Sequence, residues 1–164
     1  MSERDVKGAN FVFFGGTSGM GRAAAMELAN RGANVLVVGR DPAAGAETVQ
    51  ALRSAGASSA DFLRADISTL GGMAKAAADV VAWRPVLHGV THSAMSAFTG
   101  KQLTADGIEF AFALQYLARA VLNRLLAGAL QKSGDGRVVH VSGWVKESTT
   151  PDLDDLHYER TRWS

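Results

Sequence analysis

The sequence predicts an α/β fold, a doubly wound parallel sheet of about five strands with helices on both faces. Short apolar runs of strand length alternate along the chain with longer segments of helical composition, and this order is typical of parallel sheets. Several of the runs are continuously apolar, as expected of strands that are buried on both faces. The expected strands are residues 11–14, 35–38, 61–65, 86–91 and 137–141, and the expected helices are residues 21–31, 42–54, 69–83 and 104–131.

Local signals mark the ends of the first three expected helices. Gly32 follows the first helix as a stop signal. Asp41 has the position of an N-cap, and Pro42 has that of the first helical residue, where the missing N–H has no helical partner to lose. Pro85 closes the third helix because proline cannot continue it.

The fourth expected helix, residues 104–131, is the longest in the chain. It would begin at Thr104, with Asp106 and Glu109 in its first turns, where the helix dipole favours acidic groups. The residues expected on its apolar face are Ile108, Phe112, Leu117, Val121 and Leu125.

Composition and length predict a single soluble domain. The chain has 164 residues, of which 47% are hydrophobic and 20% are charged, and these are average values for a soluble protein. The formal net charge of +1 gives no reason to expect a nucleic-acid partner. The absence of cysteine excludes disulfides and thiolate metal sites and is compatible with a reducing cytoplasm. Because no signal peptide or membrane-spanning apolar run is present, we expect a cytoplasmic protein without a membrane span.

A glycine-rich segment, GGTSGMG, joins the first expected strand to the first expected helix. Gly15 permits a sharp turn, Gly19 allows the backbone to approach a pyrophosphate, and Gly21 allows the helix to pack closely on the sheet. The N-terminus of the helix adds unpaired N–H groups and a dipole that favour phosphate. Glycine also collects in ordinary turns, so the position of the segment at the first strand–helix junction carries the argument. It indicates a dinucleotide site in a Rossmann-type fold.

Two rival glycine motifs do not match this segment. A P-loop read from Gly16 would need lysine and a hydroxyl residue directly after Gly21, where the chain has arginine and alanine. A serine-hydrolase elbow around Ser18 would need glycine two residues later, where the chain has Met20.

With the glycines in this spacing, the segment FFGGTSGMGRAAAMELANRGANVLVVGRD closely resembles the short-chain dehydrogenase/reductase family, and the likeness runs from about Lys7 to Val141. The segments LTADGIEF and LDDL resemble the branch that contains retinol dehydrogenases and protochlorophyllide reductases. The resemblance implies a nicotinamide cofactor and hydride transfer between that cofactor and a small carbonyl or alcohol substrate. It also makes the helix at residues 104–131 a candidate surface for a homo-oligomer.

The end of the second expected strand predicts NADP rather than NAD. NAD-preferring members place an acidic residue there for the ribose 2′-hydroxyl, whereas this chain has Gly39 followed by Arg40. A guanidinium suits a 2′-phosphate through a charge-assisted hydrogen bond worth roughly 1.5–3 kcal/mol, or about ten- to a hundredfold in affinity. The alternative is that Arg40 is a solvated loop residue. Asp41 is expected to cap the next helix rather than to bind a ribose.

Other positions of the nucleotide site follow from the resemblance. Asp66 corresponds to the aspartate that contacts the adenine in the family, with Ile67 beside it. The family's Asn-Asn-Ala-Gly is His92-Ser-Ala-Met95 here, so only Ala94 is retained and Met95 would crowd the nicotinamide side. The expected cofactor-binding residues are Gly15, Thr17, Ser18, Gly19, Met20, Gly21, Arg40, Asp66, Ile67, Ser93 and Ala94.

The catalytic positions of the family match less well. The family reaction uses a tyrosine as acid/base, a lysine that lowers its pKa, a serine that polarises the carbonyl and an asparagine that maintains a proton-relay water. Gln115 stands at the asparagine position, and Gly143, after Ser142, stands at the position of the catalytic serine. No Tyr-xxx-Lys is present, and Tyr158 has an arginine at that spacing, which lacks the tunable pKa of lysine. The candidate catalytic residues are Ser142, Gln115 and Tyr158.

We expect residues 1–146 to form an NADP-binding Rossmann domain and residues 147–164 to form a polar tail. The tail resembles the stretch that precedes the catalytic tyrosine in this branch, so we interpret the chain as truncated before that motif. Three hypotheses remain open. The chain is the cofactor-binding half of an NADP-dependent oxidoreductase, or a catalytically inactive NADP-binding sensor or interaction module, or an interaction protein that assembles through its long helix without cofactor.

Four histidines raise the question of a metal site. None of them forms an i, i+4 pair on an expected helix, and no acidic partner completes a recognisable pattern, so we expect no metal. His88 and His140 lie in expected strands and are interpreted as packed sheet residues. His92 ends a strand at the edge where ligands bind in such folds, so it is a candidate contact for cofactor or substrate.

Overall fold

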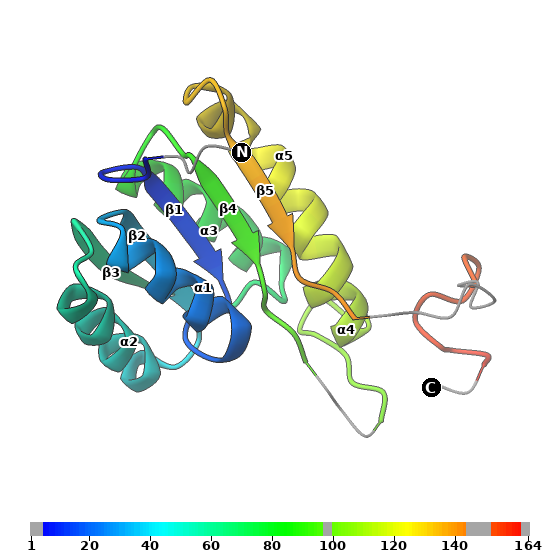
Figure 1. Ribbon diagram of the computed structural model, residues 1–164. Helices are drawn as coiled ribbons and strands as arrows, with labels where there is room; N and C mark the ends of the chain where they lie inside the picture. The colour runs from blue at the N-terminus through cyan, green and yellow to red at the C-terminus, as the bar shows by residue number, and fades with distance from the viewer. Residues whose placement is uncertain (1–4, 97–99, 144–151, 162–164) are drawn as a thin grey trace.

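A computed structural model describes residues 5–96, 100–143 and 152–161, and Figure 1 shows how their helices and strands are arranged. Within these residues, five parallel strands form one sheet in the order β3-β2-β1-β4-β5. The strands are β1 (Asn10–Phe14), β2 (Asn34–Gly39), β3 (Ser59–Arg64), β4 (Gly89–His92) and β5 (Arg137–His140). The direction of strand addition reverses at β1, which leaves a crevice at the carboxyl ends of β1 and β4.

Helices cover both faces of the sheet, so the predicted doubly wound fold is confirmed (Figure 1). On one face lie α1 (Gly19–Asn30) and α2 (Pro42–Ala55), and on the other lie α3 (Leu70–Trp83) and α5 (Ala118–Gln131). Two short elements lead directly into α5, namely α4 (Phe110–Phe112) and the π-helical turn η1 (Ala113–Leu117).

Alternate residues of the central strands supply the two cores. In β1, Val12 and Phe14 pack with α3 and α5, whereas Phe13 packs with α1 and α2. In β2, Leu36 and Val35 divide between the two cores in the same way. Each of these five side chains is at most 3% exposed. Because both faces are buried, successive residues of these strands are all apolar.

The predicted signals at the ends of α2 and α1 are confirmed. Asp41 is the N-cap of α2, and its Oδ1 accepts hydrogen bonds from the N–H groups of Ala43 (2.8 Å) and Ala44 (3.4 Å). Pro42 is the first helical residue. Gly32 follows α1 with a φ of +74°, a left-handed conformation that glycine adopts without strain.

The prediction that the long helix begins at Thr104 is wrong. Helical structure starts at Phe110, and the preceding residues form a tight turn in which the N–H of Thr104 donates to the carbonyl of Ile108 at 2.8 Å. Gly107 makes this turn possible with a φ of +74°. The acidic residues therefore have other roles, because Glu109 is the N-cap of α4 and Asp106 accepts a hydrogen bond of 2.7 Å from Leu70 N at the start of α3.

The predicted apolar face of this helix is correct in part: Leu117 and Val121 pack partly buried against the core, but Leu125 does not. The buried residues of α5 include Ala118, Leu122 and Leu126, whereas Leu125 is 49% exposed. The expectation assumed one uninterrupted helix from residue 104. The observed helical path instead begins at Phe110 and passes through the π turn η1 before α5.

The fourth strand is shorter than predicted. It starts at Gly89, although the backbone of His88 still bonds to both neighbouring strands: its N–H donates to the carbonyl of Asn10 (2.8 Å) and its carbonyl accepts from the N–H of Arg137 (3.1 Å). Asn10 Nδ2 donates to the carbonyl of Val86 at 2.9 Å, and the N–H of Asn10 donates to His88 Nδ1 at 3.0 Å. His88 therefore lies outside the strand to which it was assigned, although its imidazole is hydrogen-bonded as expected.

Candidate functional site

A cavity of about 370 Å³ opens at the carboxyl ends of β1, β2 and β4. It lies at the edge of the sheet where doubly wound folds bind their ligands. All eleven residues that the sequence nominated for a cofactor line this cavity: Gly15, Thr17, Ser18, Gly19, Met20, Gly21, Arg40, Asp66, Ile67, Ser93 and Ala94. The remaining lining residues are Val38, Gly39, Ala65, Met95, Phe110 and Leu114. The structure thus brings the nominated residues together, and their role in binding stays a prediction.

The glycines of the loop between β1 and α1 are required for different reasons. Gly15 has a φ of +91°, and a Cβ there would lie 2.6 Å from Ala94 Cα. A Cβ on Gly21 would collide with Ser93 Oγ, whose single O–H lies within hydrogen-bonding distance of the carbonyls of Phe14 (3.2 Å) and Gly15 (3.1 Å). These two glycines let the loop and the end of β4 touch.

Gly19 differs from the other two glycines because nothing fills the space beside it. Its φ is +52°, and a Cβ there would meet no atom within 4 Å. Ser18, the N-cap of α1, makes no capping hydrogen bond with its side chain. The first turn of α1 therefore faces the cavity without a protein side chain capping it there, and the dipole and N–H groups of a helix N-terminus favour an anion such as phosphate.

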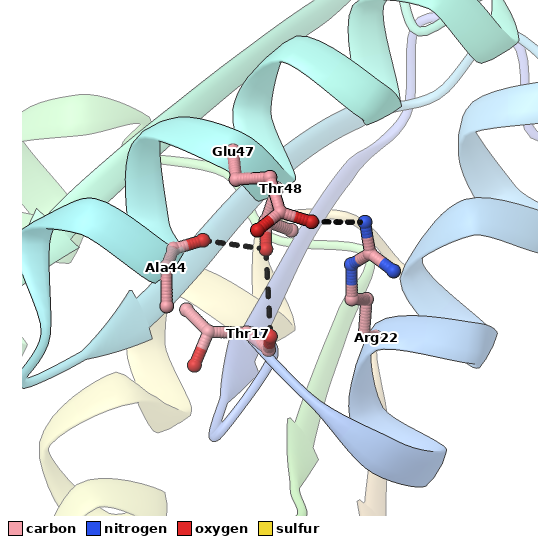
Figure 2. A network of polar contacts seen from close by, with 5 residues as sticks. All are labelled: Thr17, Arg22, Ala44, Glu47 and Thr48. Carbon is pink, nitrogen blue, oxygen red and sulfur yellow. Dashed lines mark hydrogen bonds and ion pairs between the residues drawn. The ribbon is translucent and has the colours of Figure 1, made fainter.

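A polar network, shown in Figure 2, ties the glycine loop to α2. Thr48 is 1% exposed, and its hydroxyl lies 2.8 Å from the carbonyl of Ala44 and 3.5 Å from that of Thr17 in the loop. Arg22 Nη2 lies 3.4 Å from Glu47 Oε1 on the surface beside it. The role of Thr48 was not predictable from the sequence, because nothing local distinguishes a buried threonine in a helix from an exposed one.

Arg40 and Asp41 stand side by side at the end of β2 and have different environments. The Arg40 side chain is exposed at the cavity and makes no hydrogen bond or ion pair with any part of the chain that the structure describes. The Asp41 carboxylate is used to cap α2. The expectation that Asp41 caps a helix is confirmed, and the guanidinium of Arg40 remains available to a ligand.

Asp66 and Ile67 follow β3 and line the cavity together. Asp66 Oδ1 accepts hydrogen bonds from the N–H of Ser68 (3.0 Å) and from its hydroxyl (2.7 Å), which fixes the direction of the carboxylate. Ile67 is 7% exposed and belongs to the core between the sheet and α3. Asp66 therefore combines a structural role with a position at the cavity, as expected.

None of the three candidate catalytic residues is among the described residues that line this cavity. Gln115 lies in the π turn, and its Nε2 donates to the carbonyl of Ser96 at 3.2 Å. Ser142 is exposed just after β5. Tyr158 is half-buried, and its backbone carbonyl accepts a hydrogen bond of 3.1 Å from Lys101 Nζ. The described residues thus contain no assembled constellation of these three side chains around the cavity.

The expectation that His92 faces the ligand crevice is wrong. Its side chain is 2% exposed and lies between the rings of Phe14 and His140, at centroid distances of 5.2 and 4.9 Å. His92 Nε2 donates to Asn123 Oδ1 (2.9 Å), and Asn123 Nδ2 donates to His140 Nε2 (3.1 Å), a tautomer assignment that follows from this network. Burial lowers the pKa of His92 to about 4, against the opposing effect of the Asn123 hydrogen bond. His92 is therefore a neutral packed residue.

The segment at residues 152–161, inside the expected tail, is held by its own hydrogen bonds and by the main body. The Asp155 carboxylate accepts from the N–H groups of Glu159, Arg160 and Thr161 and from the Thr161 hydroxyl. Desolvation raises the pKa of Asp155, but these hydrogen bonds outweigh it and lower the pKa to about 2. His157 Nδ1 accepts from the N–H of Glu109 at 3.2 Å, next to α4. The other tail residues, 147–151 and 162–164, lie outside the described residues.

The strand order, the glycine loop and the cavity at the carboxyl ends of the strands together define a Rossmann-type α/β protein. The sequence model of the short chain dehydrogenase family matches residues 10–151. The chain therefore belongs to the short-chain dehydrogenase family, as its resemblance implied. Within the described residues, no helix is both long and apolar enough to cross a membrane.

Two relatives illustrate the range of the family. Polyprenol dehydrogenase of Mus musculus is 34% identical over 151 residues, which are 89% of this chain and 45% of that protein. Retinol dehydrogenase 13 of Mus musculus is 25% identical over 165 residues, which are 99% of this chain and 49% of that protein. The chain thus spans about half the length of these curated relatives.

Solved structures match the fold. A metagenomic short-chain oxidoreductase in complex with NADP has a TM-score of 0.77 and 23% identity, over 98% of this chain and 71% of that chain. The NADH-dependent reductase A1-R′ complexed with NAD has a TM-score of 0.68 and 24% identity, over 83% of this chain and 60% of that chain. The solved structures of this fold thus include a complex with NADP and a complex with NAD.

Proposed function

We propose that this chain forms the nucleotide-binding part of an NADP-dependent short-chain oxidoreductase. The reaction class is hydride transfer between NADP(H) and a small carbonyl or alcohol substrate. The observation that carries the proposal is the cavity at the carboxyl edge of the sheet, which joins an open helix N-terminus to an exposed arginine without an ion-pair partner in the described residues.

The residues around the cavity fit a dinucleotide. The open side of Gly19 and the first turn of α1 suit a pyrophosphate, and Asp66 with Ile67 suits an adenine. Met20, Met95, Phe110 and Leu114 add an apolar wall that suits a second ring. When bound, the nicotinamide would supply the hydride or accept it. The residues of this chain would hold the nucleotide and exclude water from one side of it.

The preference for NADP rests on Arg40. A 2′-phosphate at the end of β2 would pair with its guanidinium, and the neighbouring Asp41 carboxylate is used to cap α2. One such pair is worth roughly 1.5–3 kcal/mol, or about ten- to a hundredfold in affinity.

The affinities of the chain for NADPH and NADH, with Arg40→Ala alongside, test this preference. We expect NADPH to bind at least about tenfold more tightly, and Arg40→Ala to remove the difference while leaving NADH binding nearly unchanged. Arg124→Ala is the matched control, because Arg124 is an exposed arginine of α5 that does not line the cavity. Equal affinities for both nucleotides in the wild-type chain would contradict the proposal.

Catalysis is a separate proposal. Gln115, Ser142 and Tyr158 are the candidate catalytic residues by correspondence with the family, and they would have to approach a substrate bound beside the nucleotide. Tyr158 would act as the acid/base, Ser142 would polarise the carbonyl, and Gln115 would hold a relay water.

A second candidate function is a catalytically inactive NADP-binding sensor or interaction module. Met95 and Gly143 favour it, because they replace a glycine and a catalytic serine of the family pattern, and the chain contains no Tyr-xxx-Lys. Turnover separates the two candidates. NADPH oxidation in the presence of a panel of small aldehydes and ketones would support the oxidoreductase, and tight nucleotide binding without oxidation would support the module.

We propose that residues 1–146 are the nucleotide-binding domain and residues 147–164 an appended segment, and that the protein acts in the cytoplasm without a nucleic-acid partner. Residues 104–131 are the proposed surface of a homo-oligomer.

A further inference from the structure

All sulfur atoms of this protein are methionine thioethers, because the sequence contains five methionines and no cysteine. Four of them lie in the described part of the chain, and they divide sharply by exposure. Met73 is 0% exposed and Met26 is partly buried against the core under α1, whereas Met20 is 67% and Met95 is 51% exposed. Exposure governs oxidation of a thioether, so the last two are the accessible sulfurs of this set.

Both exposed methionines line the same cavity. Met20 lies in the first turn of α1 and Met95 in the loop after β4. The segments that carry them are in contact, because Gly15 touches Ala94 and Gly21 leaves room for Ser93 only by lacking a Cβ. Two elements that are far apart in sequence therefore place their thioethers at one opening.

Met20 and Met95 belong to the apolar part of the cavity lining. Together with Phe110 and Leu114, the methionines form its apolar wall, whereas Ser18, Arg40 and Asp66 supply polar groups elsewhere. A thioether is apolar and polarisable and packs well against a planar aromatic ring. A sulfoxide is polar and hydrated, and burying it against a ring without a hydrogen-bond donor is costly.

We propose that Met20 and Met95 are oxidation sites. A hydroperoxide that converts their thioethers to sulfoxides weakens nucleotide binding at this cavity. The sulfur lone pair attacks the terminal peroxide oxygen, the O–O bond breaks and an S–O bond forms. The thioether is oxidised by two electrons to the sulfoxide, and the peroxide is reduced and leaves as water or an alcohol after taking up a proton. This inference rests on the proposed nucleotide binding, and methionine sulfoxide reductases provide the reverse reaction.

The test is treatment of the purified chain with dilute hydrogen peroxide, followed by peptide mass spectrometry and NADPH titration. We expect Met20 and Met95 to gain oxygen before Met26 and Met73. We also expect the Kd for NADPH to rise by roughly tenfold or more while the circular-dichroism spectrum stays unchanged. Incubation with methionine sulfoxide reductases A and B and a thiol reductant should restore the original Kd.

Variants assign the effect to the two sites. In Met20→Leu/Met95→Leu the ratio of Kd after peroxide to Kd before it should fall to about one, whatever the starting affinity of that variant. Met26→Leu is the matched control and should keep the wild-type ratio. An unchanged Kd in a wild-type chain oxidised at both sites would overturn the inference, as would an equal rise in the double variant. If the untreated chain does not bind NADPH at all, the proposed function itself fails, and that result is visible before any peroxide is added.

Discussion

The side chains around the cavity fall into two groups, those already used by the fold and those left for a ligand. Asp41 caps α2, and Ser93 Oγ donates to the backbone beneath the glycine loop. Arg40 is exposed and unpaired within the described residues, and Gly19 has open space on its Cβ side. The same edge of the sheet thus provides a rigid frame and unsatisfied binding groups, which is the combination that a preformed nucleotide site needs.

His92, which stands where the family has asparagine, packs tightly into the fold. Its imidazole is sandwiched between Phe14 and His140 and is hydrogen-bonded to Asn123. Burial of a cation in this stack is unfavourable, which is why the pKa of His92 falls to about 4. Protonation must therefore weaken the packing of β4 next to Ser93 and Ala94, which line the cavity.

We predict that stability declines as pH falls from 6.5 towards 4. The pKa of His92 is 6.5 in the unfolded chain and about 4 in the fold, so its contribution is fully present above pH 6.5, decreases as pH falls below 6.5 and is lost below about pH 4. The difference corresponds to roughly 3 kcal/mol. Urea unfolding between pH 4 and 7 measures it, and His92→Asn should flatten this part of the profile. A wild-type profile without a slope between pH 6.5 and 4 would contradict the assignment.

The ends of helices were predicted correctly from the sequence where the interactions that define them lie within one helical turn. Asp41 and Pro42 define the start of α2 because capping and a missing N–H act within one turn. The start of the long helix was not predictable in this way. Asp106 resembles a first-turn acid in the sequence, yet it caps α3 some 36 residues away, and that role depends on the tertiary fold.

We predict that Asp41→Ala lowers the free energy of unfolding by about 1 kcal/mol, because two N–H groups at the start of α2 lose their acceptor. Asp41→Ser should keep most of the stability, since serine is an equally good N-cap. Chemical denaturation of the three proteins measures the difference. Equal loss in both variants would show that capping is not the role of this side chain.

For the whole molecule, the sequence was sufficient to predict the fold and the cluster of residues around the cavity. Strand–helix alternation, the glycine loop and the residues that end β2, β3 and β4 all converge on one edge of a parallel sheet, so their proximity follows from topology. The orientation of His92 depends on packing between distant segments. The position of residues 152–161 beside α4 also has no local signature.

The two exposed elements at one side of the molecule lead to a prediction about assembly. All four residues of β5 are exposed, and Val139 is 52% exposed at an edge of the described sheet, while Leu125 on α5 is 49% exposed. Exposed apolar surface of this kind favours association. We predict a homo-oligomer through residues 104–131, whose mass falls to that of a monomer in Leu125→Lys.

Analytical ultracentrifugation over a range of concentrations measures this mass. Val139→Lys is the companion variant, because it places the same charge on the edge strand β5, and it should leave the oligomer intact. Dissociation by Val139→Lys and not by Leu125→Lys would assign the contact to the sheet edge. A wild-type chain that is a monomer at every concentration would contradict assembly altogether.

Measuring the NADPH affinity of two glycine variants tests whether the cavity beside the glycine loop binds a nucleotide. Gly19 (φ +52°) and Gly8 (φ +70°) are both left-handed, and a Cβ on either meets no protein atom within 4 Å, but only Gly19 lines the cavity. Gly19→Ala and Gly8→Ala should therefore each lose about 1 kcal/mol of stability. Only Gly19→Ala should bind NADPH at least about tenfold more weakly, since its methyl group occupies the place of the phosphates. Equal NADPH affinity in both variants and the wild type, or no NADPH binding by the wild type, would contradict the account.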